Sequence, residues 1–149
     1  MPSSLRQTLH ERHHLALVDE TSIEAFLAPP MGAPAHAILF FAGDPAERAE
    51  TRDLAVILPQ LIEAFAGRLR GALVAIDAEP ALKERFHVRV LPSLVVLRGS
   101  EILGVLPKVY DWGDYVARVE TMLRPDAPAL VAKSGPRAEI VFASREAAP

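Results

Sequence analysis

The 149-residue chain contains no cysteine. This absence excludes thiol–disulfide exchange, a nucleophilic cysteine, thiolate metal ligation and iron–sulfur ligation. It does not fix the compartment, because a protein without cysteine is compatible with either redox setting. A chain of this length buries about two thirds of the surface that its unfolded form exposes, so it needs no disulfide or metal to fold. We therefore expect a single core without a cofactor.

The sequence also lacks a strong charge of one sign and a long hydrophobic run. Its net charge is −3, from 16 basic and 19 acidic residues, and no segment shows the basic excess that is usual for nucleic-acid binders. The longest apolar runs, 37–42 and 94–97, are far too short to cross a bilayer. The polar segment 1–14 has no apolar core of a secretory signal. We expect a soluble cytoplasmic protein that neither binds nucleic acid nor inserts into a membrane.

Continuous apolar runs predict the strands of an α/β domain. The runs 37–41, 72–77 and 94–97 are typical of strands that are buried on both faces. A tight turn at 98–100 leads into a further strand over 101–106.

The segments between these strands have helical spacing. Apolar residues from Leu54 to Phe65 predict a helix that Pro59 kinks, a shorter helix covers 80–87, and Asp111 opens the last helix. A helical crossover makes the first two strands parallel, whereas the tight turn makes the last two antiparallel. The sequence therefore predicts a mixed sheet with helices on both faces.

Several of these segments resemble thioredoxin. The run 74–77, followed by Pro80, 86–88 and 91–94, is similar to the third strand, short helix and cis-proline loop of that fold. The resemblance implies a three-layer α/β/α domain with a mixed central sheet, and a cis peptide bond between Leu91 and Pro92.

The same resemblance sets the expected domain boundaries. The thioredoxin-like domain covers 15–123, an extra N-terminal helix lies within 1–14, and 124–149 is a flexible tail rich in Pro and Ala.

The resemblance fails where thioredoxins carry their Cys-x-x-Cys motif, because this chain has 43–50 at that place, without a thiol. A cysteine-free family of hydrogenase-expression accessory proteins, the HyaE/HupG type, is more similar. Its pattern Arg-Phe-x-Val-x-x-x-Pro occurs here at 85–92. Residues 104–106 and Asp111-Trp112 also resemble the hairpin exit and the helix start of that family. This resemblance implies a non-enzymatic cytoplasmic chaperone for the small-subunit precursor of a nickel–iron uptake hydrogenase, with the twin-arginine signal peptide of that subunit as its ligand.

Acidic residues recur every third position after the first central strand, at Asp44, Glu47, Glu50 and Asp53. Ligands of α/β folds usually bind at such strand ends. Since carboxylates accept bidentate hydrogen bonds from arginine, one interpretation is a rim that binds guanidinium groups. The other is a solvated helix start that complements the helix dipole.

The segment Val90-Leu91-Pro92 is the second candidate for partner binding. A cis bond before Pro92 would turn the backbone of Val90 and Leu91 outward and leave an N–H and a C=O for an extended peptide. The alternative is that Pro92 only shapes the turn before a buried strand.

Other polar and aromatic residues are given structural roles. His10, His13 and His14 have helical spacing that suits Ni²⁺ or Zn²⁺, but no carboxylate or thiol completes the set, so we interpret them as a polar surface cluster. Asp77 is interpreted as a cap for the helix 80–87. Trp112 and Tyr115 are assigned to the core.

The sequence holds no catalytic triad, phosphate-binding loop or paired catalytic carboxylates. We therefore expect a protein without enzymatic activity. Two alternatives remain at this point: a redox-inert thioredoxin-like scaffold for another protein assembly, and a thiol-independent activity in the same groove.

Overall fold

The structure is a computed structural model that describes residues 8–11, 15–28, 31–44 and 49–130. The strands are β1 (Ala16–Val18), β2 (His36–Phe41), β3 (Leu69–Val74), β4 (Ser93–Arg98) and β5 (Glu101–Pro107). The α-helices are α2 (Ile23–Leu27), α3 (Ala49–Ala64), α4 (Glu79–Arg85) and α5 (Trp112–Met122), and a 3₁₀ turn at Ile76–Ala78 precedes α4. Residues 8–11 are also helical.

The strands form one mixed sheet in the order β1-β3-β2-β4-β5. β2 pairs in parallel with β3 and antiparallel with β4, while β5 pairs antiparallel with β4. The parallel pair is joined by the α3 crossover, and the antiparallel pair by a tight turn in which Gly99 has a φ of 59°. The predicted thioredoxin-like α/β class is confirmed.

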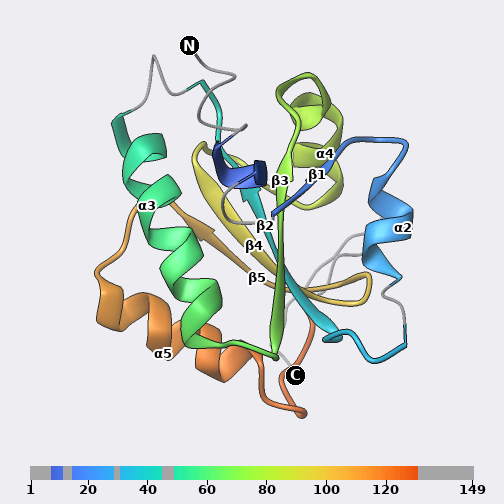
Figure 1. Cartoon of the computed structure of the whole chain (residues 1–149), viewed down its shortest axis with the longest axis vertical. Coiled ribbons are helices and arrows are strands. Elements are labelled where there is room, and N and C mark those ends of the chain that lie inside the picture. Colours follow the sequence, from blue (N-terminus) through green and yellow to red (C-terminus); the bar gives the residue numbers. More distant parts are fainter. Residues whose placement is uncertain (1–7, 12–14, 29–30, 45–48, 131–149) are drawn as a thin grey trace.

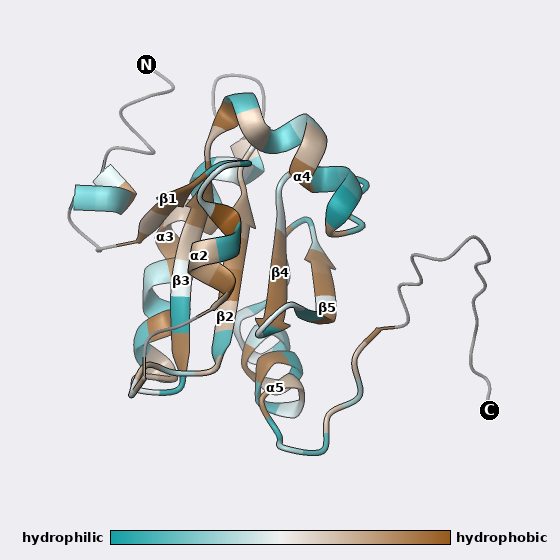
Figure 2. Cartoon of the chain, turned by 90° about the vertical axis from the view of Figure 1, so that its right-hand side faces the viewer, coloured by the Kyte–Doolittle hydropathy of each residue, from teal (hydrophilic) through white to brown (hydrophobic). Residues whose placement is uncertain are grey.

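The side chains of β2 divide the core into two halves. Ile38 and Phe40 face α3 and α5, whereas Leu39 and Phe41 face α2 and α4. All four are fully buried, as the continuous apolar run predicts for a central strand. Figure 1 shows the two helical layers on opposite sides of the sheet, and Figure 2 shows that the central strands are predominantly hydrophobic.

The bounds of two elements, β3 and α3, differ substantially from the predicted ones, whereas the other bounds differ by a residue or two. β3 covers Leu69–Val74 rather than 72–77, because its backbone pairs with β2 from Leu69 onward even though Arg70 and Gly71 interrupt the apolar run. α3 begins at Ala49 and contains Pro59, so Glu50 and Asp53 belong to the helix rather than to a connector before it.

The strand register brings several loops to one edge of the sheet. Phe41 at the end of β2 pairs with Ser93 at the start of β4, and Ser93 pairs with Pro107 at the end of β5. Since β3 is parallel to β2, its end lies at this edge as well. We call this place the connector edge, and it comprises the described residues 42–44, 75–79, 90–92 and 108–112.

Because one side of α3 packs against the sheet, truncating a side chain to alanine should destabilise the protein on that side and not on the exposed side. Leu58 is fully buried, whereas Val56 is 63% exposed. Leu58→Ala should lower the free energy of unfolding by about 2 to 5 kcal/mol, because it leaves a cavity in a packed core. The control Val56→Ala should change it by less than about 0.5 kcal/mol. Urea denaturation of both variants at constant m-value measures the difference, and equal effects would contradict the assigned orientation of α3.

Candidate partner-binding site

The predicted acidic residues have different surroundings. Asp44 follows β2 and is half-buried, whereas Glu50 and Asp53 are exposed in the first two turns of α3. Because they are three positions apart, Glu50 and Asp53 lie on one side of the helix. Glu47 lies outside the described residues. The part of the predicted rim that the structure describes is therefore one residue at the strand end and two on the helix.

The hydroxyl of Thr51 near the start of α3 donates to the carbonyl oxygen of Ala42, and Phe41, the residue before Ala42, pairs with Ser93 next to Pro92. Burial raises the pKa of Tyr115, hydrogen bonding by the backbone of Tyr110 lowers it, and the charges of Tyr110 and Glu50 make smaller contributions that raise it. The hydroxyl of Tyr115 donates to the carbonyl oxygen of Lys108 at 3.1 Å. The amide of Lys108 in turn donates to the carbonyl oxygen of Pro92 at 2.9 Å. The acidic start of α3 and the Pro92 loop thus border the same region of the connector edge.

The bond between Leu91 and Pro92 is cis, as predicted. Pro92 itself is buried, and Leu91 is half-buried against the core on the α2 and α4 face. The hydroxyl of Ser93 donates to the carbonyl oxygen of Val90 at 2.7 Å. The loop thus uses the Val90 carbonyl oxygen internally.

The backbone of Leu91 differs from that of Val90 in this respect. Within the described part of the chain, neither its amide nor its carbonyl group makes a hydrogen bond. Its side chain packs inward, so the Leu91 backbone, rather than its side chain, has unused hydrogen-bonding groups in this loop.

Exposed apolar side chains accompany this loop. Trp112 is 44% exposed and Val90 is 38% exposed, and both lie at the connector edge. The assignment of Trp112 to the core is wrong, because it is the first residue of α5 and the buried stripe begins one turn later at Tyr115. The amphipathic pattern predicted the helix correctly but did not show how far its first turn extends beyond the sheet.

Glu79, and not Asp77, is the carboxylate that is buried at this edge. Asp77 is exposed in the 3₁₀ turn, and α4 has no side-chain cap, so the capping role given to Asp77 is wrong. Glu79 is only 5% exposed, and its Oε2 accepts a hydrogen bond from the amide of Gly43 at 2.9 Å. Sequence reasoning missed it because the two residues are 36 positions apart.

The histidine cluster is only partly described. Nδ1 of His10 lies 2.7 Å from the carbonyl oxygen of Leu15 and donates to it, while His13 and His14 lie outside the described residues. Among the residues that the structure does describe, no group of three or more His, Asp or Glu side chains is arranged to hold a metal ion.

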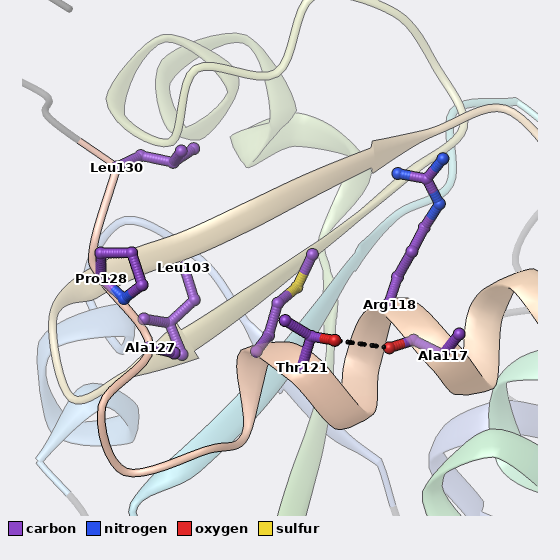
Figure 3. A pocket seen from close by; sticks show the side chains of 8 residues that line it. Leu103, Ala117, Arg118, Thr121, Ala127, Pro128 and Leu130 are labelled. Carbon is purple, nitrogen blue, oxygen red and sulfur yellow. Dashed lines mark hydrogen bonds between the residues drawn. The ribbon is translucent and has the colours of Figure 1, made fainter. Parts of the chain in front are cut away.

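An apolar pocket lies away from the predicted site, between β5, α5 and the segment after α5 (Figure 3). Its volume is about 490 Å³, and its apolar lining includes Leu103, Met122 and Ala127. The amide of Leu130 donates to the carbonyl oxygen of Ile102 at 2.7 Å, so this segment runs beside the edge strand. In the described ranges, no helix is long and apolar enough to cross a membrane.

Comparison with known proteins decides the family. The family model of the hydrogenase-1 expression protein HyaE matches residues 5–115. A hydrogenase expression/formation protein HupG from Rhizobium leguminosarum bv. viciae is 53% identical over 148 residues, which cover 99% of both chains. The chain belongs to this family. It is thus an accessory protein of hydrogenase expression and formation, with a role in hydrogenase maturation.

Other relatives agree with this assignment. A HupG protein from Bradyrhizobium diazoefficiens is 46% identical, over 75% of this chain and 76% of its own. A solved structure of a HupG-type hydrogenase expression/formation protein from Rhodopseudomonas palustris is 45% identical, with a TM-score of 0.52 over 72% of this chain and 94% of its own.

The interpretation of the histidines as a surface cluster predicts that folding is independent of metal. A chelator should leave the thermal midpoint of the purified protein unchanged, because the hydrophobic core suffices for stability at this chain length. Differential scanning calorimetry with and without the chelator measures this, and a His10→Gln, His13→Gln, His14→Gln variant serves as the metal-free reference. A clear drop in the midpoint of the wild type alone would show that the cluster holds a structural metal.

Proposed function

We propose that this protein is a redox-inactive chaperone that binds the small-subunit precursor of a nickel–iron hydrogenase through its twin-arginine signal peptide, at the connector edge. Membership of a hydrogenase expression/formation family supports the class of client. The observation that supports this site is that the start of α3 and the cis-proline loop both adjoin the end of β2, through the Thr51–Ala42 hydrogen bond and the pairing of Phe41 with Ser93. The absence of cysteine supports a binding role rather than redox chemistry.

The chemistry of such a peptide fits these two features. It offers two adjacent guanidinium groups followed by an apolar stretch. In the proposed complex the guanidinium groups meet the carboxylates of Asp44, Glu47 or Glu50. The backbone of the apolar stretch pairs with Leu91, and its side chains contact Val90 and Trp112.

The two contacts contribute in different ways. Exposed ion pairs each contribute about 0 to 1 kcal/mol, so the carboxylates mainly set the orientation and the association rate. Burial of apolar surface contributes about 25 cal/mol per Å², and exposed aromatic side chains are frequent centres of binding energy. The apolar contact therefore supplies more of the affinity.

Neutralising the acidic rim should weaken binding moderately and reduce its salt dependence. The variant Asp44→Asn, Glu47→Gln, Glu50→Gln should bind the signal peptide about three- to tenfold more weakly at low salt. Its affinity should change less than that of the wild type when salt is added. Calorimetric titration at two salt concentrations measures both effects.

A control with the same change of net charge separates local from global electrostatics. Glu20, Glu63 and Asp126 are exposed and lie outside the connector edge, so Glu20→Gln, Glu63→Gln, Asp126→Asn should bind like the wild type. If the rim variant also binds like the wild type at low salt, the acidic residues are only a helix start and the peptide binds elsewhere.

Changes to the exposed apolar side chains should weaken binding more than changes to the rim. Leu91 is unsuitable for this test because it packs against the core, whereas Val90 and Trp112 are exposed. Val90→Asp and Trp112→Ala should each reduce the affinity by about tenfold or more, with little salt dependence, and leave the thermal midpoint nearly unchanged. Val56, which is 63% exposed and lies outside the connector edge, provides the control Val56→Ala. Unchanged affinity in both variants would contradict the apolar contact.

A further inference from the structure

One peptide group at the end of β2 is held through both of its polar atoms. The carbonyl oxygen of Ala42 accepts a hydrogen bond from the hydroxyl of Thr51. The amide of Gly43, which belongs to the same peptide group, donates to Oε2 of Glu79 at 2.9 Å. Thr51 is fully buried and Glu79 is 5% exposed, so both bonds lie inside the protein.

The two partners approach from opposite layers. Thr51 is in α3, which packs on one face of the sheet, and Glu79 begins α4 on the other face. The C=O and N–H of a trans peptide group point in opposite directions and share one plane. Two bonds at opposite ends of this plane therefore resist its rotation, which neither bond would do as well alone.

The fixed peptide group lies where the chain leaves the sheet. Gly43 has a φ of 72°, a left-handed conformation that glycine adopts without steric cost. Asp44 comes next and begins the acidic rim. The direction in which Asp44 leaves β2 is thus determined by the peptide plane that precedes it and by this turn.

Burying the Glu79 carboxylate for a purely structural hydrogen bond carries a large desolvation cost. Removing a charge from water costs much more than removing a neutral amide, and a neutral side chain of the same reach would also accept the Gly43 amide. What the carboxylate adds is a stronger, charge-assisted bond at the one peptide group that orients the rim.

We propose that Glu79 and Thr51 are positioning residues that lock the 42–43 peptide group and so set the direction of the acidic rim toward the client peptide. This inference deepens the proposed function and rests on it for its consequence in binding. The locking itself is a property of the free protein, so it is measured separately.

The first measurement uses the free, full-length protein. Amide hydrogen exchange by NMR should show faster exchange of the Gly43 amide in Glu79→Leu by about tenfold, as expected for the loss of one buried hydrogen bond, together with a shifted Asp44 amide resonance. Glu79→Gln keeps an acceptor but loses the charge, so it should restore most of the protection at Gly43 and most of the Asp44 shift. Leu82→Val, a change to a buried residue of the same helix, should alter neither. Wild-type exchange at Gly43 in Glu79→Leu would overturn the proposal.

The second measurement is calorimetric titration with a synthetic peptide of two adjacent arginines followed by about ten apolar residues. Glu79→Leu and Thr51→Val should each weaken binding about three- to tenfold, with rescue by Glu79→Gln and Thr51→Ser. Because both residues hold one peptide group, the double variant should lose less than the product of the two single losses.

Three outcomes separate the ideas. Multiplicative losses, or losses that Leu82→Val reproduces at equal thermal stability, would overturn the joint lock and leave only a general stability effect. Failure of the wild type to bind the peptide would reject the proposed function. In that case, exchange of the Gly43 amide and the resonance position of the Asp44 amide in the free protein test whether Glu79 and Thr51 lock the peptide group.

Discussion

Burial of β2 on both faces is the constraint on which the rest of the structure depends. Ile38 to Phe41 are fully buried, so each side of this strand needs its own helical layer. Its backbone must also be paired on both edges, with β3 on one side and β4 on the other. A strand of this kind leaves no polar group exposed to water until it ends, and the chain must then leave the core without unpaired peptide groups. Thr51 and Glu79 meet that requirement at Ala42 and Gly43.

The strands and the main helices could be predicted because their signals are local. A continuous apolar run identified β2, and helical spacing identified α3 in spite of Pro59. Predictions failed where tertiary contacts override the local pattern. Arg70 and Gly71 interrupt the apolar run of the sequence, but parallel pairing with β2 extends β3 through them. There the side chain of Arg70 donates to the carbonyl oxygen of Pro34 and lies over the ring of Phe26, which accommodates a charge within the strand.

The candidate site could be predicted only in part, for a related reason. The cis-proline loop has a local motif, and the structure confirms its geometry. Glu79 has no such motif, since its role appears only when the end of β2 and the start of α4 are brought together. Asp77, two residues earlier, has the stronger local signal of a cap, yet it is exposed. A hydrogen bond from a polar side chain to a backbone group far away in the sequence cannot in general be predicted from a pattern within one segment.

The two interpretations of the acidic residues can be separated by their positions in α3. Glu50 lies in the first turn, where a carboxylate stabilises the positive end of the helix dipole, so a structural role alone explains it. Asp53 lies beyond that turn, where the effect of the dipole has fallen off, and within the described residues it has no ion-pair or hydrogen-bond partner. Its exposed carboxylate has no role in stabilising the helix start. The helix-start interpretation therefore accounts for Glu50 alone, whereas the interpretation as a rim that binds guanidinium groups covers both carboxylates.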